Sequence, residues 1–171
     1  MNIVLTGFMG TGKSIVGEKL AQRLGMGYID TDQIIEEREG CEISKIFKEK
    51  GEDYFRKIET EVVKEVSSFN NCVIATGGGV VLKEENIKAL RRKGIIISLS
   101  ANPRVILERT SKSKKRPLLL NCPDPYERIE RMLNFRKPYY EKMDLKIDTS
   151  FLNPTEVVEK ILKFLRKDGD N

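Results

Sequence analysis

The 171-residue sequence contains no histidine. That absence excludes a Ser-His-Asp triad, a histidine general base and any zinc site that depends on imidazole ligands. A proton acceptor in this chain must therefore be a carboxylate, a lysine, a tyrosine or a cysteine.

Cysteine is scarce, and long apolar runs are missing. Cys41, Cys72 and Cys122 lie far apart and form no Cys-x-x-Cys pair, which is typical of free thiols in a reducing compartment. No apolar run approaches the roughly 20 residues of a membrane-spanning helix. No basic segment precedes the first apolar run, as it would in a secretory signal. We therefore expect a cytoplasmic protein without a membrane partner.

The composition is that of an ordinary globular domain, with 39% hydrophobic and 33% charged residues. The formal net charge is +5. Nucleic-acid surfaces interleave basic and aromatic residues, but the densest basic cluster, residues 112–116, contains no aromatic side chain. We therefore expect no nucleic-acid partner. A solvated surface or an anionic small molecule such as ATP explains the excess charge.

Short apolar runs alternate with segments of helical periodicity along the chain. We expect strands at residues 2–6, 28–30, 73–75, 95–99 and 145–148. This alternation predicts an α/β fold, a three-layer sandwich in which helices cover both faces of a five-stranded parallel sheet. Ligands of such sheets bind at the carboxyl ends of the strands.

The first apolar run leads into Gly7-Phe8-Met9-Gly10-Thr11-Gly12-Lys13-Ser14, and a helical pattern follows. This spacing is that of a phosphate-binding loop, whose glycines let successive N–H groups face one anion at a helix N-terminus. We expect Lys13 to reach the β- and γ-phosphates and the Ser14 hydroxyl to ligate Mg²⁺. The alternative is a chance match in a glycine-containing turn. The predicted ATP contacts of this segment are Gly10, Thr11, Gly12, Lys13, Ser14 and Ile15.

Asp30-Thr31-Asp32 directly follows the second expected strand. The third strand carries no aspartate of the Walker B kind, so Asp30 is the candidate to approach Mg²⁺, directly or through water. Asp32 can then accept the proton of an acceptor hydroxyl. The alternative is simple helix capping by Asp or Thr.

Three further segments carry candidate acceptor contacts. Thr76-Gly77-Gly78-Gly79 follows the third strand and permits close backbone approach to a ligand. Arg56, in Phe55-Arg56-x-x-Glu59, and Arg136 suit a planar carboxylate if both face one pocket. Otherwise they are solvated arginines with weak local ion pairs.

Residues 111–123 are basic, contain two prolines and no acid, and are expected to form a loop. A loop that closes over ATP would bring Arg116 to the transferring phosphoryl group and exclude water. A solvated basic loop is the alternative.

Taken together, these motifs resemble the shikimate kinase family over nearly the whole chain. The resemblance implies a P-loop fold of the nucleoside monophosphate kinase type, with strand order 2-3-1-4-5. It also implies transfer of the γ-phosphoryl group of ATP to the 3-hydroxyl of shikimate, with Lys13, Asp32 and Arg116 as catalytic residues. Arg116 belongs to the lid.

The resemblance also implies ligand contacts. Some family members place an arginine near the adenine in the segment matching 148–154. This chain has none there, so Arg109 and Pro154 are the adenine-side candidates. Ser14 and Asp30 would hold one Mg²⁺ per ATP. The implied shikimate contacts are Asp32, Arg56, Gly77, Gly78, Gly79 and Arg136.

We expect one kinase domain over residues 1–171, acting as a monomer. Its expected parts are a core (1–30, 62–110 and 124–171), an acceptor-binding region (31–61) and a lid (111–123). The nearest alternative is a related P-loop kinase acting on gluconate or a nucleoside monophosphate. Asp32 favours a hydroxyl acceptor, but gluconate also offers hydroxyls and a carboxylate. A non-catalytic nucleotide-binding switch would leave the triple glycine and the two arginines without a purpose.

Overall fold

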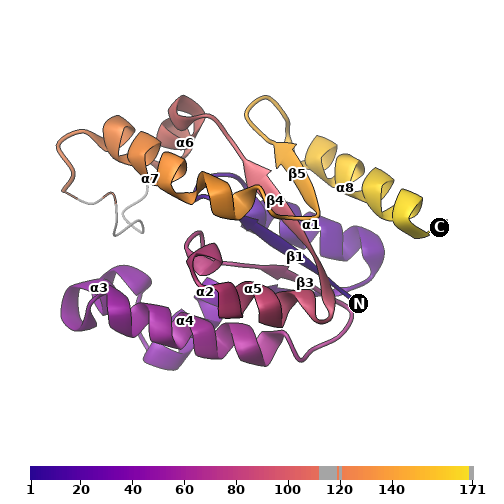
Figure 1. The fold of residues 1–171 in the computed structure, drawn as a ribbon, viewed down its shortest axis with the longest axis horizontal. Helices are drawn as coiled ribbons and strands as arrows, with labels where there is room; N and C mark the ends of the chain where they lie inside the picture. Colours follow the sequence, from indigo (N-terminus) through magenta and orange to yellow (C-terminus); the bar gives the residue numbers. More distant parts are fainter. Residues whose placement is uncertain (112–118, 120, 170–171) are drawn as a thin grey trace.

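The computed structural model describes residues 1–111, 119 and 121–169. Its five parallel strands form one sheet in the order β2-β3-β1-β4-β5, with helices on both faces (Figure 1). The α/β class and the strand order are those expected from the sequence. The strands are β1 (Asn2–Gly7), β2 (Gly27–Asp30), β3 (Cys72–Ala75), β4 (Gly94–Ser100) and β5 (Leu145–Asp148).

Nine helical segments in the described part of the chain connect or flank these strands. They are α1 (Lys13–Leu24), α2 (Thr31–Glu39), α3 (Ile43–Lys50), α4 (Glu52–Val66), the 3₁₀ helix η1 (Val80–Leu82), α5 (Glu84–Arg91), α6 (Pro103–Thr110), α7 (Pro125–Tyr140) and α8 (Pro154–Gly169). Most of the segment expected to form a lid, residues 112–118 and 120, lies outside the described residues.

β1 is the central strand, and all six of its residues are buried. It pairs in parallel with β3 and β4, so that Leu5 lies between Ala75 and Ile97. A strand covered on both faces must be apolar on both faces. The continuous run Ile3-Val4-Leu5 is therefore the pattern that its position requires.

Alternate residues of the strands enter two hydrophobic cores on opposite faces of the sheet. Val4 and Ile96 belong to the core formed with α4, α5, α6 and α7. Leu5 and Ile97 belong to the core formed with α1 and α8. This alternation follows from the two-residue period of a strand. The segments that carry the predicted site follow the carboxyl ends of β1, β2 and β3.

Local sequence signals explain where the site-bearing helices begin. Asp30 accepts hydrogen bonds from the N–H groups of Asp32 and Gln33 and caps α2. Asn102 caps α6 through the N–H of Val105, and Pro103 occupies the first turn, where its missing N–H costs nothing. None of the helices in the described part of the chain has the length and apolar character needed to cross a bilayer.

Candidate active site

The phosphate loop joins β1 to α1 in the conformation that its glycines permit. Gly10 has φ +76° and Gly12 has φ +93°, values that L side chains rarely adopt. Gly12 is also the N-cap of α1, so the first turn of that helix directs its N–H groups toward the loop. Lys13 Nζ donates to the carbonyl oxygens of Gly7 at 2.8 Å and Phe8 at 2.9 Å. The ammonium therefore lies over the loop.

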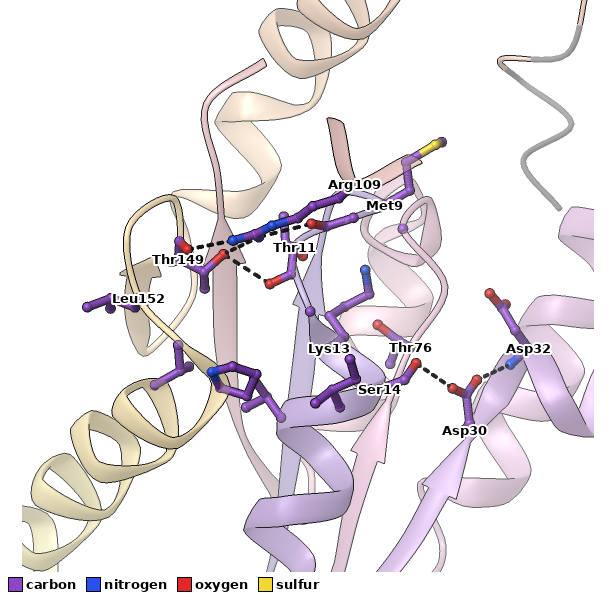
Figure 2. Close-up of a pocket in the computed structure, with 17 residues that line it drawn as sticks. Met9, Thr11, Lys13, Ser14, Asp30, Asp32, Thr76, Arg109, Thr149 and Leu152 are labelled. Atoms are coloured by element: carbon purple, nitrogen blue, oxygen red, sulfur yellow. Dashed lines mark hydrogen bonds between the residues drawn. The ribbon is translucent and has the colours of Figure 1, made fainter. Parts of the chain in front are cut away.

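A cleft of about 480 Å³ opens at this loop and extends along the carboxyl ends of the strands (Figure 2). It also reaches Asp32 and Gly78 on the acceptor side. Arg116 lies outside the described residues, so its position stays a prediction. The other predicted ATP contacts all line the cleft: Gly10, Thr11, Gly12, Lys13, Ser14, Ile15, Arg109 and Pro154.

Ser14 and Asp30 lie side by side on the floor of the cleft. The Ser14 hydroxyl donates to Asp30 Oδ2 at 2.9 Å, and the other carboxylate oxygen caps α2. Capping and a role in the cleft are therefore compatible for Asp30. No cluster of three or more metal-binding acids, cysteines or histidines occurs among the described residues. A hydroxyl and one carboxylate nevertheless fit Mg²⁺, which keeps several waters and usually takes only one or two protein oxygens beside phosphate.

Tyr28 supports this pair and was not anticipated from the sequence. Its hydroxyl donates to Asp30 Oδ2 at 3.3 Å. Burial, and then the negative charge of Asp30, raise the pKa of Tyr28 well above its usual range, so the phenol keeps its proton. The available signal was spacing, because residues two apart on a strand point to the same face.

Asp32 lies against the triple glycine. A Cβ built on Gly77 would lie only 2.8 Å from Asp32 Oδ1 and 2.8 Å from Glu59 Oε1. The N–H of Gly77 donates to the buried hydroxyl of Thr31 at 3.2 Å, which ties the glycine segment to the start of α2. Asp32 and Glu59 therefore face one small volume bordered by backbone.

Arg56 projects from α4 to the same segment. Its Nη1 donates to both oxygens of Glu59, at 3.1 and 2.9 Å, and its Nη2 donates to Glu52 at 3.3 Å. Glu59 is fully buried, and burial raises the pKa of its carboxyl, opposed by the positive charges of Arg56, Arg136 and Lys83. The sequence motif contained Glu59, but only the fold reveals that it buttresses the arginine.

Arg136 reaches the glycine segment from α7, on the opposite side. It is 4% exposed, its guanidinium lies 5.5 Å from the centroid of the Phe8 ring, and its Nη1 would lie 3.6 Å from a Cβ on Gly78. Tyr140, one turn later, donates from its hydroxyl to the carbonyl of Gly78 at 2.6 Å. The two predicted arginines therefore converge on one segment, although 80 positions separate them in sequence.

Close approach, and not unusual backbone geometry, requires these glycines. Gly77, Gly78 and Gly79 all have negative φ or extended backbone, so their dihedral angles would accept other residues. A Cβ on Gly79, however, would lie 2.3 Å from Arg56 Nη1. The site's own side chains therefore fill the space that a larger residue would need.

Thr149 and Leu152 also line the cleft and were not predicted. They lie on the side of Arg109 and Pro154, where the adenine base of ATP is expected, and we call this side the base-side wall. Both belong to the loop between β5 and α8. Thr149 directly follows a strand's carboxyl end, the position that identified Asp30 to Asp32, so the same rule could have identified it.

Comparisons with known proteins show what the whole chain is similar to. The protein-family model for shikimate kinase matches residues 9–166. The shikimate kinase of Thermodesulfovibrio yellowstonii is 51% identical over 162 residues, which cover 95% of this chain and 93% of that protein.

Solved structures show how far the likeness extends in space. The shikimate kinase from Acinetobacter baumannii in complex with shikimate superposes with a TM-score of 0.94 at 36% identity, covering 98% of this chain and 93% of that one. A gluconokinase from Sinorhizobium meliloti gives a TM-score of 0.64 at 20% identity, covering 99% of this chain and 94% of that one, a likeness of fold alone. The chain therefore belongs to the shikimate kinase family.

Proposed function

We propose that this chain transfers the γ-phosphoryl group of ATP to the 3-hydroxyl of shikimate, giving shikimate 3-phosphate and ADP. The observation that carries the proposal is the placement of Asp32 within the cleft that also holds Lys13 and Ser14. A nucleotide bound at the phosphate loop and an acceptor hydroxyl bound at Asp32 would then meet at the carboxyl ends of the strands.

The acceptor would bind through its carboxylate and its hydroxyls. Arg56 and Arg136 offer guanidinium groups on two sides of the triple glycine, and such groups bind carboxylates with defined geometry. Glu59 holds the Arg56 fork in place through two hydrogen bonds. This arrangement orients the acceptor so that its 3-hydroxyl faces Asp32, which accepts the proton as the oxygen attacks phosphorus.

The nucleotide would bind through its phosphates and its base. The N–H groups of the phosphate loop and the ammonium of Lys13 oppose the phosphate charge, which grows on the leaving oxygen in the transition state. Ile15, Arg109 and Pro154 border the base end of the cleft. Arg116, in the expected lid, would add positive charge near the transferring group and exclude water.

Magnesium is part of this proposal. Ser14 and Asp30 are the residues that would hold it, and when bound it neutralises charge on the β- and γ-phosphates. Asp30 keeps its capping bond to α2 in the arrangement described, so the same carboxylate can serve both tasks with different oxygens.

We also propose that the enzyme is a cytoplasmic monomer of one domain that binds neither nucleic acid nor membrane. The proposal is supported by isolated cysteines and by an ordinary net charge of +5. Sedimentation of the purified protein at micromolar concentration tests the oligomeric state, and a dimer would contradict the proposed monomer.

A coupled assay of ADP release tests the activity. Shikimate, gluconate and AMP are offered separately with ATP and Mg²⁺. We expect rapid ADP release only when shikimate is the acceptor. Asp32 and the arginine pair suit a hydroxy acid better than AMP, and membership of the shikimate kinase family favours shikimate over gluconate. A higher kcat/KM for gluconate or AMP than for shikimate would overturn the assignment.

A further inference from the structure

Thr149 joins the base side of the cleft to the phosphate loop. It lies just after β5, is 2% exposed, and donates its hydroxyl to the carbonyl of Thr11 in the phosphate loop at 3.0 Å (Figure 2). The same hydroxyl oxygen also lies 3.1 Å from the carbonyl of Ser100. The hydroxyl has one proton to donate, and its contact with the Thr11 carbonyl is the shorter of the two.

Arg109 completes the link from α6. Its Nη2 donates to the Thr149 carbonyl at 2.8 Å, and its Nη1 donates to the Thr149 hydroxyl at 3.1 Å and to the Gly10 carbonyl at 3.1 Å. The guanidinium edge is thus held by three acceptors from two segments. Thr149 contacts both the arginine on the base side and the loop on the phosphate side.

The phosphate loop also has bonds of its own that do not involve Thr149. The Thr11 hydroxyl donates to the Phe8 carbonyl at 2.7 Å, and Gly10 and Gly12 set the backbone path. Loss of the Thr149 hydroxyl should therefore leave the loop able to bind phosphate. It would, however, remove the direct bond between the loop and the segment after β5, and leave the Arg109 bond to the Gly10 carbonyl as the remaining tie described above.

We propose that Thr149 is a positioning residue that sets the register between the base subsite and the phosphate subsite of the nucleotide. The inference rests on the proposed function, because ATP must fill both subsites at once. A ligand that spans two rigid subsites loses affinity when one shifts against the other, whereas a ligand of only one subsite does not. This difference separates positioning from a merely structural role.

The experiment compares two ligands and three variants. Calorimetry measures the Kd of ATP, which spans both subsites, and of inorganic tripolyphosphate, which occupies only the phosphate loop. Thr149→Val removes the hydroxyl and keeps the shape, and Thr149→Ser keeps the hydroxyl. Thr110→Val is the matched control: Thr110 is 4% exposed and its hydroxyl donates within α6, to Ile106 at 2.7 Å.

Thr149→Val should raise the Kd of ATP about tenfold, which is the usual effect of losing one hydrogen bond in a site. It should change the Kd of tripolyphosphate by less than about twofold. The KM for shikimate should stay unchanged. Thr149→Ser and Thr110→Val should both bind ATP as the wild type does. If Thr149→Val does not fold, Thr149→Cys replaces it, because a thiol is only a weak donor. It should likewise weaken the binding of ATP and leave the binding of tripolyphosphate nearly unchanged.

Two results overturn the inference. One is an equal loss of ATP and tripolyphosphate affinity, which would assign Thr149 to the shape of the loop alone. The other is unchanged ATP affinity in Thr149→Val. Measurements on the wild type distinguish a failure of this inference from a failure of the proposed function. If the wild-type protein binds ATP and phosphorylates shikimate, the proposed function stands, even when Thr149→Val binds ATP normally.

Discussion

At the scale of single residues, Asp32 has the position of a proton acceptor. Its carboxylate lines the nucleotide cleft and lies against the backbone of Gly77. The chain has no histidine to take that part. A carboxylate at the meeting point of two substrates is therefore the group best placed to receive the hydroxyl proton.

Asp32→Asn should lower kcat about 10²- to 10⁴-fold, because an amide of the same shape cannot accept the proton. The coupled ADP assay measures kcat, and thermal melting checks the fold. Asp53→Asn, an exposed acid in the first turn of α4, is the control and should retain full activity. Turnover within about threefold of wild type in Asp32→Asn would remove Asp32 from this role.

Glu59 and Glu52 both contact Arg56, but only one is buried. The Glu59 side chain is 1% exposed, whereas that of Glu52 is 49% exposed. Glu59→Gln should raise the KM for shikimate about tenfold, because a buried charged partner orients the guanidinium more strongly than an exposed one. Glu52→Gln should change that KM by less than about twofold, because exposed pairs contribute little. Equal KM values in the two variants would contradict the buttressing role of Glu59.

At the scale of elements, the turn from β3 to η1 carries the acceptor site. Side chains from three helices meet there: Asp32 comes from α2, Glu59 and Arg56 from α4, and Arg136 from α7. Gly77 lies against Asp32 and Glu59, Gly79 lies against Arg56, and Gly78 lies near both Arg136 and the backbone of the phosphate loop. The turn is therefore a spacer whose lack of side chains leaves room for groups from distant elements.

Gly79→Ala should weaken shikimate binding about tenfold while changing stability little. The new Cβ would displace the Arg56 guanidinium, the end of a flexible side chain, and Gly79 has an unstrained φ of −95°. Gly40→Ala is the opposite case, with φ +66° and no atom within 4 Å. It should cost about 1 kcal/mol of stability through backbone strain and leave shikimate KM unchanged. Steady-state kinetics and denaturant unfolding measure the two effects, and the reverse pattern would contradict this account.

At the scale of the whole molecule, both proposed ligands bind loops at one end of one sheet. ATP binding to the folded state alone should stabilise it, by about 2.7 kcal/mol at a concentration of 100 Kd. For a domain of this size that corresponds to a Tm increase of roughly 5–10 °C. Differential scanning calorimetry with ATP and Mg²⁺ measures the shift. No shift at saturating ATP would contradict nucleotide binding in the cleft.

Removal of Mg²⁺ should impair ATP binding and turnover but leave shikimate binding unchanged. Excess EDTA should abolish ADP release and reduce the ATP-induced Tm increase, because Ser14 and Asp30 would then face phosphate without a bridging cation. Any Tm increase caused by shikimate alone should persist, since Arg56 and Arg136 need no metal. Full activity in EDTA would contradict the magnesium part of the proposal.

Local sequence patterns were sufficient to predict the main helices and strands. Pro103 and Pro125 mark the first turns of α6 and α7. The alternation of apolar runs and helical segments led to the parallel sheet, and the strand order followed from the resemblance to a family. Local patterns could not reveal that Tyr140 holds Gly78 or that Thr149 holds Thr11, because those contacts join residues 62 and 138 positions apart.

The phosphate loop, the strands and the acids after β2 were therefore determined by the sequence itself, because glycine spacing and hydrophobic periodicity act over a few residues, whereas Arg109 and Pro154 became candidates only through the family resemblance. Only the tertiary structure decided that Arg56 and Arg136 face the same glycines and that Glu59 is buried behind them. Such contacts depend on how α4 and α7 pack at the end of the sheet. That packing is a collective result of the core, and no short segment encodes it.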